Sequence, residues 1–177
     1  MIANFNNLTT KEEVINTVKE FCTSHELEII EENIAKPWGG YLRFSDESAA
    51  KFISLFFNPG EIENDDLYNI SPKILIIAPH ARLSWQYHHR RSEIWKVVEG
   101  KVGIMLSDDD AETSMTSYGE GAIIRVKKEN RHRLAGFETW GILAEIWQHT
   151  DPQNPSDEED IVRIGDDFGR QGSTNRN

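Results

Sequence analysis

The chain has 177 residues and a mass of 20.3 kDa, and 38% of its residues are hydrophobic, which fits one globular domain with a core. Its 19 Lys and Arg against 30 Asp and Glu give a net charge of −11, which argues against nucleic acid as a partner. No hydrophobic run reaches the roughly 20 residues of a membrane span, and no secretory signal is visible. The single cysteine, Cys22, excludes an internal disulfide, so we expect a cytoplasmic protein with no membrane partner.

The first predicted element is an amphipathic helix from about residue 10 to residue 24. Thr9 and Thr10 precede Glu12 and Glu13 at the spacing of a capping box, and hydrophobic residues then recur with helical period. We expect the hydrophobic face of this helix to pack on the main domain or on a second subunit.

The rest of the chain predicts strands. Residues 36–41 read as a loop that enters a strand, and residues 52–57 read as a strand that ends at a Pro-Gly turn. Short hydrophobic or alternating runs then follow one another, separated by turn residues, at 74–78, 82–88, 93–99, 101–106, 122–126, 132–135 and 140–147. Many closely spaced strands with no convincing helix between them predict an antiparallel barrel or sandwich.

Four side chains in this region are candidate metal ligands. On a strand, alternate residues share a face, so Gln86 and His88 project together. Residues 89–92 can form a short connection that brings Glu93 back beside His88 on an antiparallel neighbour, and His132 follows on a later strand. Imidazole and carboxylate bind divalent metals, and the Gln oxygen is a weaker neutral ligand. We therefore predict one divalent ion, with Zn²⁺ as the leading metal and Ni²⁺, Mn²⁺ and Fe²⁺ as alternatives.

The same strand alternation places two further residues near the predicted metal. Arg82 and Ser84 share the face of Gln86 and His88, so both are candidate contacts for a bound substrate. For Arg82, a salt bridge at a barrel rim is an equally weighted alternative.

The spacing of the metal candidates resembles the two motifs of the cupin superfamily. The matching positions are Gln86, His88, Glu93 and Gly100 in the first motif, and Gly121, His132 and Gly136 in the second. The spacing matches throughout, while Lys127, Glu129 and Gly136 stand where the second motif has Pro, Gly and Asn.

Within the cupins, the chain resembles the type II phosphomannose isomerase domain, which also forms the carboxy-terminal part of bifunctional mannose-1-phosphate guanylyltransferases. The shared features are a Pro-Trp-Gly entry, a Leu-Ser-x-Gln-x-His-His run ending in Arg-Ser-Glu, a His-Arg pair, a strand that begins with Glu, and an acidic tail. They occur here at 37–39, 83–93, 132–133, 145–148 and 159–163. Arg90 and Ile94 depart from the pattern, since each replaces a His.

The resemblance implies an all-β fold, a cupin or jelly-roll barrel of two antiparallel sheets with an N-terminal helical extension. The expected organisation is an extension at 1–35, a barrel at 36–150 and an acidic C-terminal extension at 151–177 that ends in a disordered tail. The resemblance to cupins, together with the hydrophobic face of the helix, also implies a homodimer.

The implied function is a metal-dependent aldose–ketose isomerase of a phosphorylated sugar, such as mannose 6-phosphate. Two alternatives stay open. One is a non-catalytic cupin that binds a sugar or sugar phosphate, which the departures at Arg90 and Ile94 favour. The other is an isomerase or epimerase of a different phosphorylated sugar, such as a heptose.

The resemblance also suggests roles for individual residues. Glu145 is the candidate general base, with a structural pairing to an arginine as the alternative, and Lys73 is the second candidate catalytic residue. Arg91 and Arg133 carry the family motif and are the candidates for binding phosphate, because guanidinium offers a planar fork of donors. Arg90, Lys36 and Lys73 are further candidates for the same role, with a solvated surface position as the alternative for Lys36.

Overall fold

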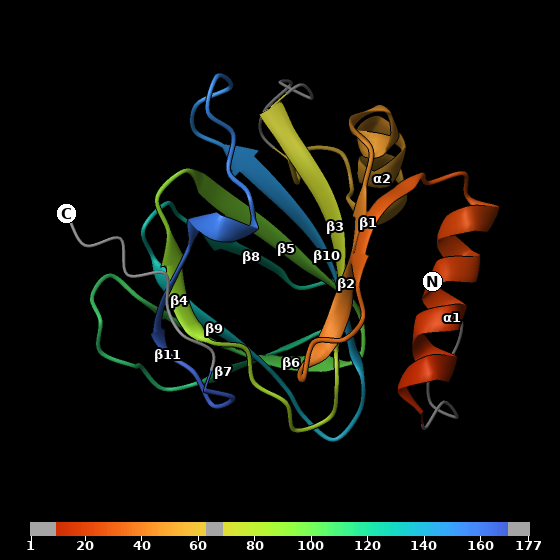
Figure 1. Ribbon diagram of the computed structural model, residues 1–177. Helices are drawn as coiled ribbons and strands as arrows, with labels where there is room; N and C mark the ends of the chain where they lie inside the picture. Colours follow the sequence, from red (N-terminus) through yellow and green to blue (C-terminus); the bar gives the residue numbers. More distant parts are fainter. Residues whose placement is uncertain (1–9, 63–68, 170–177) are drawn as a thin grey trace.

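The computed structural model describes residues 10–62 and 69–169, which form a barrel of two antiparallel sheets with two helices on one side (Figure 1). The predicted disordered end, at 171–177, lies outside the described residues. The first sheet has the order β1-β2-β3-β10-β5-β8. Its strands are β1 (Ile29–Asn33), β2 (Gly39–Phe44), β3 (Ile70–Ile77), β10 (Gly141–His149), β5 (Arg91–Glu99) and β8 (Ile123–Val126).

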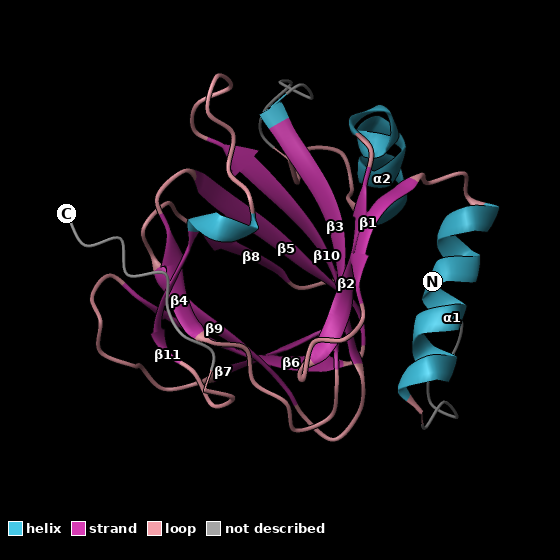
Figure 2. Cartoon of the chain, viewed as in Figure 1, coloured by secondary structure: helices cyan, strands magenta, loops and turns pink. Residues whose placement is uncertain are grey.

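The second sheet closes the other side of the barrel, in the order β11-β4-β9-β6-β7 (Figure 2). Its strands are β11 (Ile161–Gly165), β4 (Trp85–His88), β9 (Arg131–Gly136), β6 (Lys101–Ser107) and β7 (Thr116–Gly119). The two-sheet antiparallel barrel confirms the predicted fold class.

Both faces of the central strands β3 and β10 of the first sheet are buried, which explains their continuous hydrophobic runs. Alternate residues divide between two cores: Ile74 and Ile76 point outward to the helices, while Leu75 and Ile77 point into the barrel. On β10 the same alternation sends Glu145 and Trp147 inward, where they line a cavity. The pleat of the central strands therefore decides which side chains can form a site.

The predicted N-terminal helix is confirmed as α1 (Lys11–Ser24). Thr10 caps it, and the Thr10 and Glu13 side chains form the reciprocal bonds of a capping box. Its buried residues, including Val14 and Val18, join the core outside the first sheet. The hydrophobic face of α1 thus packs on its own barrel, and the homodimer stays a prediction that this face no longer supports.

The strand predicted at 52–57 is wrong, because residues Ala49–Phe56 form the helix α2 after a short 3₁₀ turn, η2 (Asp46–Ser48). Ala49, Phe52 and Phe56 are buried at helical spacing against the outer face of the first sheet. The aromatic and β-branched composition suggested a strand, but burial of one helical stripe and the helix-favouring start at Ala49 decide the conformation.

Strands β1, β7 and β11 were not predicted. β1 pairs with β2 from within the segment assigned to the N-terminal extension, and β11 pairs with β4 from beyond residue 150. Both sheets therefore extend past the predicted barrel range of 36–150, whose boundaries remain a prediction. A 3₁₀ turn, η4 (Glu158–Asp160), precedes β11 at the end of the barrel that faces the viewer in Figure 1.

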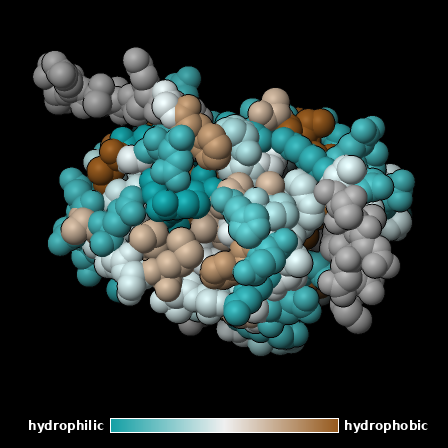
Figure 3. Space-filling model, turned by 90° about the horizontal axis from the view of Figure 1, so that it is seen from below, coloured by the Kyte–Doolittle hydropathy of each residue, from teal (hydrophilic) through white to brown (hydrophobic). Residues whose placement is uncertain are grey.

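The surface is largely hydrophilic, in line with the net charge. In the view of Figure 3, hydrophobic residues lie in small groups among hydrophilic ones. No helix in the described part of the chain is both long enough and apolar enough to cross a membrane.

Candidate metal centre and barrel cavity

Two histidines meet inside the barrel. His88 at the end of β4 and His132 on β9 are each 2% exposed, and their Nε2 atoms lie 3.2 Å apart. The Nδ1 atoms bond to backbone carbonyl oxygens, His88 to Asp160 at 3.2 Å and His132 to Asn130 at 2.9 Å. Because a carbonyl only accepts, each Nδ1 carries the proton and each Nε2 presents a lone pair. Burial lowers the pKa of both imidazoles, so they are neutral at physiological pH.

Glu93 on β5 completes this cluster. Its carboxylate lies 3.3 Å from Nε2 of His88 and 3.6 Å from Nε2 of His132. One ligand atom from each of the three residues fits within 4.8 Å of the others. Converging lone pairs and a carboxylate repel one another unless a cation lies between them, so this buried donor set fits a divalent metal ion.

Arg91 is the cation that the structure places beside the cluster. Its Nε donates to Glu93 at 2.7 Å, and its Nη2 lies 3.1 Å from Nε2 of His88. Nη1 donates to the Ser156 hydroxyl and to the Asp157 carbonyl. A metal ion bound by His88 would therefore compete with Nη2 for the same lone pair. All three nitrogens of Arg91 have a partner in this arrangement, and of the five N–H groups one on Nη2 remains for a ligand, so its role in binding phosphate stays a prediction.

Gln86 faces the cluster from β4, directly opposite His132 in the strand register. Its oxygen accepts from the Ser84 hydroxyl at 2.5 Å, and its nitrogen lies 3.5 Å from Nε2 of His132. Ligation of a metal by Gln86 requires the amide to turn over, so that its oxygen faces the histidines. Its place as a fourth ligand remains a prediction.

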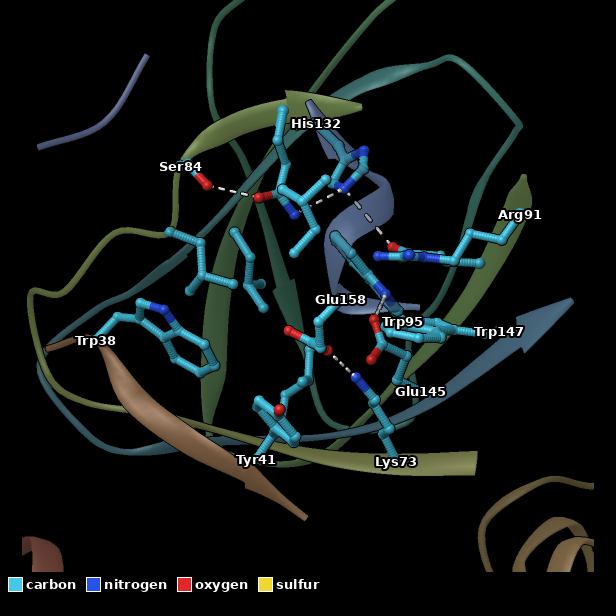
Figure 4. A pocket seen from close by; sticks show the side chains of 16 residues that line it. Trp38, Tyr41, Lys73, Ser84, Arg91, Trp95, His132, Glu145, Trp147 and Glu158 are labelled. Carbon is cyan, nitrogen blue, oxygen red and sulfur yellow. Dashed lines mark hydrogen bonds and ion pairs between the residues drawn. The ribbon is translucent and has the colours of Figure 1, made fainter. Parts of the chain in front are cut away.

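The cluster forms one part of a cavity in which about 460 Å³, counting the open solvent at its mouth, is not filled by protein atoms (Figure 4). The polar residues that line it are Lys73, Ser84, Gln86, Arg91, Glu93, His132, Glu145 and Glu158. Aromatic rings from Trp38, Tyr41, Trp95 and Trp147 make up much of the remaining wall. The result is a polar interior with hydrophobic sides, the usual composition of a small-molecule site.

Glu145 lies in the middle of the cavity wall. It is opposite Trp95 on β5, whose indole nitrogen donates to it at 2.9 Å, and opposite Lys73 on β3. Burial, and next the charge of Glu93, raise the pKa of Glu145 to about 8. A carboxyl group with a pKa in this range can both take up and release a proton near neutral pH, as proton transfer between substrate carbons requires.

Lys73 is buried at the end of the cavity opposite the His-Glu-His cluster. Its ammonium forms an ion pair with Glu158 of η4 and lies 3.5 Å from the centroid of the Trp147 ring and 4.3 Å from that of Tyr41. Burial lowers the pKa of Lys73, while Glu158 and Glu145 raise it. In Figure 4, Lys73 and His132 lie at opposite ends of the cavity.

Three predicted substrate contacts lie elsewhere. Arg82 is outside any strand, forms only an isolated bridge with Ala135, and lies near Glu112 and Asp167. Arg133 points to the opposite face of β9 from His132 and contacts the same two carboxylates, at 3.1 and 3.5 Å. Neither arginine is among the residues that line the cavity, so their role as substrate contacts stays a prediction that this geometry does not support. Lys36 lies at the margin, 5.7 Å from the Tyr41 ring centroid.

Sequence reasoning missed Glu158. The residue immediately precedes the acidic segment 159–163 that carried the family resemblance, and nothing in the local sequence separates it from Glu159 beside it. The structure separates them, since Glu158 lines the cavity and Glu159 is exposed.

The turn before His132 has Glu129 at a position where the second motif has Gly. Glu129 has φ of 65°, the left-handed conformation that Gly adopts most readily, and its N–H donates to the carbonyl of His88. The turn thus stays pinned beside the first motif, which holds His132 next to His88.

A two-sheet barrel with an interior His-Glu-His cluster defines a cupin, and solved structures share this fold. The vicilin of hazelnut (Corylus avellana) superposes with a TM-score of 0.55 at 15% identity, covering 75% of this chain and 34% of vicilin. A variant of oxalate decarboxylase from Bacillus subtilis gives 0.55 at 11% identity, covering 76% and 30%. A third structure, a cupin sugar phosphate isomerase from Silicibacter pomeroyi, has a TM-score of 0.41 at 14% identity, covering 46% and 52%, which is too low to show a shared fold. The chain thus spans about a third of the length of the first two.

The sequence model of the family described as mannose-6-phosphate isomerase C-terminal matches residues 57–166. The chain belongs to this family. A search of curated proteins found no significant match.

Proposed function

We propose that the chain is a metal-dependent aldose–ketose isomerase of a phosphorylated sugar, with mannose 6-phosphate as the first substrate to test. The observation that carries the proposal is the position of Glu145, between the His-Glu-His cluster and Lys73 in one cavity. Family membership supports it. We propose Zn²⁺ as the metal, because neutral imidazoles and a carboxylate suit it, with Ni²⁺, Mn²⁺ or Fe²⁺ as alternatives.

Isomerisation between C2 and C1 requires a group that removes a proton from one carbon and returns it to the other. Glu145 supplies this group, since its pKa near 8 permits both protonation states at neutral pH. The Trp95 N–H holds one carboxyl oxygen in place, so that proton transfer uses the other. A divalent ion bound by the cluster would polarise the substrate oxygens and stabilise the negative charge of the enediolate.

The charge of the cavity suits an anionic substrate. With Glu145 protonated, Lys73 and Arg91 balance Glu93 and Glu158 among the charged lining residues. A divalent ion would add two positive charges, and the loaded cavity would then attract an anion.

The non-catalytic alternative loses part of its support. Ile94 replaces a family His, but its side chain lies in the outer core with the helices, away from the cavity. Arg90 contacts Asn154, Pro155 and Asp157 on the C-terminal segment and does not line the cavity. Neither departure therefore changes a residue that lines the cavity, whereas these were the two features that favoured a binding protein.

The test is enolisation in D₂O. Metal-loaded protein should exchange the C2 proton of mannose 6-phosphate or another aldose phosphate for deuterium, and a chelator should stop the exchange. Fructose 6-phosphate tests the reverse direction, and heptose and pentose phosphates test the alternative substrates. If the protein binds these sugar phosphates but exchanges no proton of any of them, the proposed isomerase activity is wrong and the chain is a non-catalytic binding protein.

A further inference from the structure

Lys73 is a buried cation whose only hydrogen-bonded counter-ion among the described residues comes from outside the barrel. Its side chain is 2% exposed, and two aromatic rings and Glu158 surround its ammonium. Tyr41 and Trp147 belong to the central strands β2 and β10, whose positions the sheet holds. Glu158 belongs instead to the three-residue turn η4, and its side chain is 34% exposed. Of these partners, Glu158 is the one that can leave with least disturbance of the fold.

Glu158 also separates two cavities. A second cavity, with about 330 Å³ of free space, lies beside the first, and Lys73, Trp147 and Glu158 line both. Arg43 and Ser71 contribute to its wall. A Glu158 side chain that turned away from Lys73 would therefore find space and water on the second side, where its charge would be solvated.

Trp147 adds an unused donor at the same place. Its indole nitrogen is buried and has no hydrogen-bond partner in the part of the chain that the structure describes. An unpaired buried donor is destabilising, so such groups are uncommon without a role. A ligand oxygen beside Lys73 could accept from it.

We propose that Lys73 and the Trp147 N–H bind the phosphate group of the substrate, and that the Glu158 carboxylate occupies this anion site until the phosphate displaces it. Exchange of one anion for another leaves Lys73 paired throughout, so the buried cation is never left alone. The phosphate carries more charge than the carboxylate it replaces and has more acceptor oxygens, which favours the exchange.

This site would orient the sugar along the cavity. Glu145 lies directly opposite Lys73, and the metal cluster lies farther along the cavity, so a sugar whose phosphate is at Lys73 would extend past Glu145 toward the cluster, with C1 and C2 between the two. The phosphate then serves as a handle whose binding energy positions the reacting carbons. The inference rests on the proposed function only in taking a sugar phosphate as the natural ligand.

Inorganic phosphate is the probe for the experiment. Its dissociation constant is measured by calorimetry for metal-loaded wild type, Glu158→Gln, Glu159→Gln and Lys73→Met. We expect Glu158→Gln to bind phosphate on the order of tenfold more tightly, because a competing charge-assisted contact is removed. Glu159→Gln makes the same charge change one residue away on an exposed side chain and should match wild type. Lys73→Met should lose most of the affinity.

Two controls keep the result interpretable. His132→Ala reports any phosphate that binds at the metal, and should leave the Glu158 effect in place. The double variant Lys73→Met, Glu158→Gln avoids a lone buried charge and should bind as weakly as Lys73→Met. Equal affinity in wild type, Glu158→Gln and Glu159→Gln would overturn the proposal.

These measurements also distinguish failure of the proposed phosphate site from failure of the proposed isomerase activity. Loss of turnover in Glu158→Gln with unchanged phosphate affinity would make Glu158 a proton-transfer group and overturn the anion site. Tighter phosphate binding in Glu158→Gln, without enolisation of any sugar phosphate by wild type, would retain the site and exclude the isomerase.

Discussion

Glu145 and Lys73 lie directly opposite each other across β10 and β3, with both side chains inside the barrel. Burial acts on them in opposite directions, since it raises the pKa of the carboxyl group and lowers that of the ammonium. The pair therefore links the stability of the barrel to pH.

Glu145→Gln should reduce the pH dependence of stability. The folded pKa of Glu145, about 8, lies above its ordinary value of 4.5, so the folded state holds a proton that the unfolded chain has released. Wild-type stability should therefore fall as pH rises from about 4.5 to about 8, by roughly 1.4 kcal/mol per unit of pKa difference at most. Urea unfolding at several pH values checks this. Parallel curves for wild type and Glu145→Gln would contradict it.

The metal should depend on His132 and not on His89. Removing His132 takes away one of three converging ligand atoms, whereas His89 is exposed and pairs with Glu129. Elemental analysis should give about one divalent ion per chain in wild type and in His89→Ala, and well below one in His132→Ala. Full occupancy in His132→Ala would remove the assignment.

Arg91→Ala should destabilise the fold more than Arg90→Ala does. The Arg91 side chain is 2% exposed, and its loss leaves Glu93 buried without its closest cation. Breaking such a buried pair typically costs about 3–5 kcal/mol. Arg90 is 26% exposed and pairs mainly with exposed Asp157, so its loss should cost less. Chemical denaturation of metal-free proteins compares the two, and added metal should recover part of the Arg91→Ala deficit by replacing the missing charge.

Arg133→Ala should affect stability without affecting phosphate binding. Arg133 is buried on the outer face of the second sheet, where it pairs with Glu112 and contacts the carbonyl of Gly165. Its loss should lower the melting temperature and leave the dissociation constant for inorganic phosphate unchanged. Weaker phosphate binding in a folded Arg133→Ala protein would return this residue to the substrate site.

The sequence by itself determined the antiparallel β class, the N-terminal helix and the candidate metal donors, while the resemblance to a family favoured a barrel over a sandwich. These follow from periodicity and short-range spacing: a capping box at Thr10, alternation between Gln86 and His88, and a turn that returns Glu93 to the same interior. Strand alternation predicts that Arg133 points outward, because its neighbour His132 points inward. The family motif was given more weight, and it led to the assignment of Arg133 to the substrate site. The helix α2 was missed because its hydrophobic residues are β-favouring, and only packing against the sheet shows which stripe is buried.

Only the tertiary structure decided how the charged groups pair. Glu158 forms an ion pair with Lys73, from which it is separated by 85 positions in the sequence. The Arg91 guanidinium forms its hydrogen bonds with Glu93, His88 and the C-terminal segment. No local sequence pattern predicts these contacts, because the partner of a buried charge depends on which residues the fold brings close to it. The same holds for Glu145, whose pKa depends on burial and on the charges that surround it in the assembled barrel.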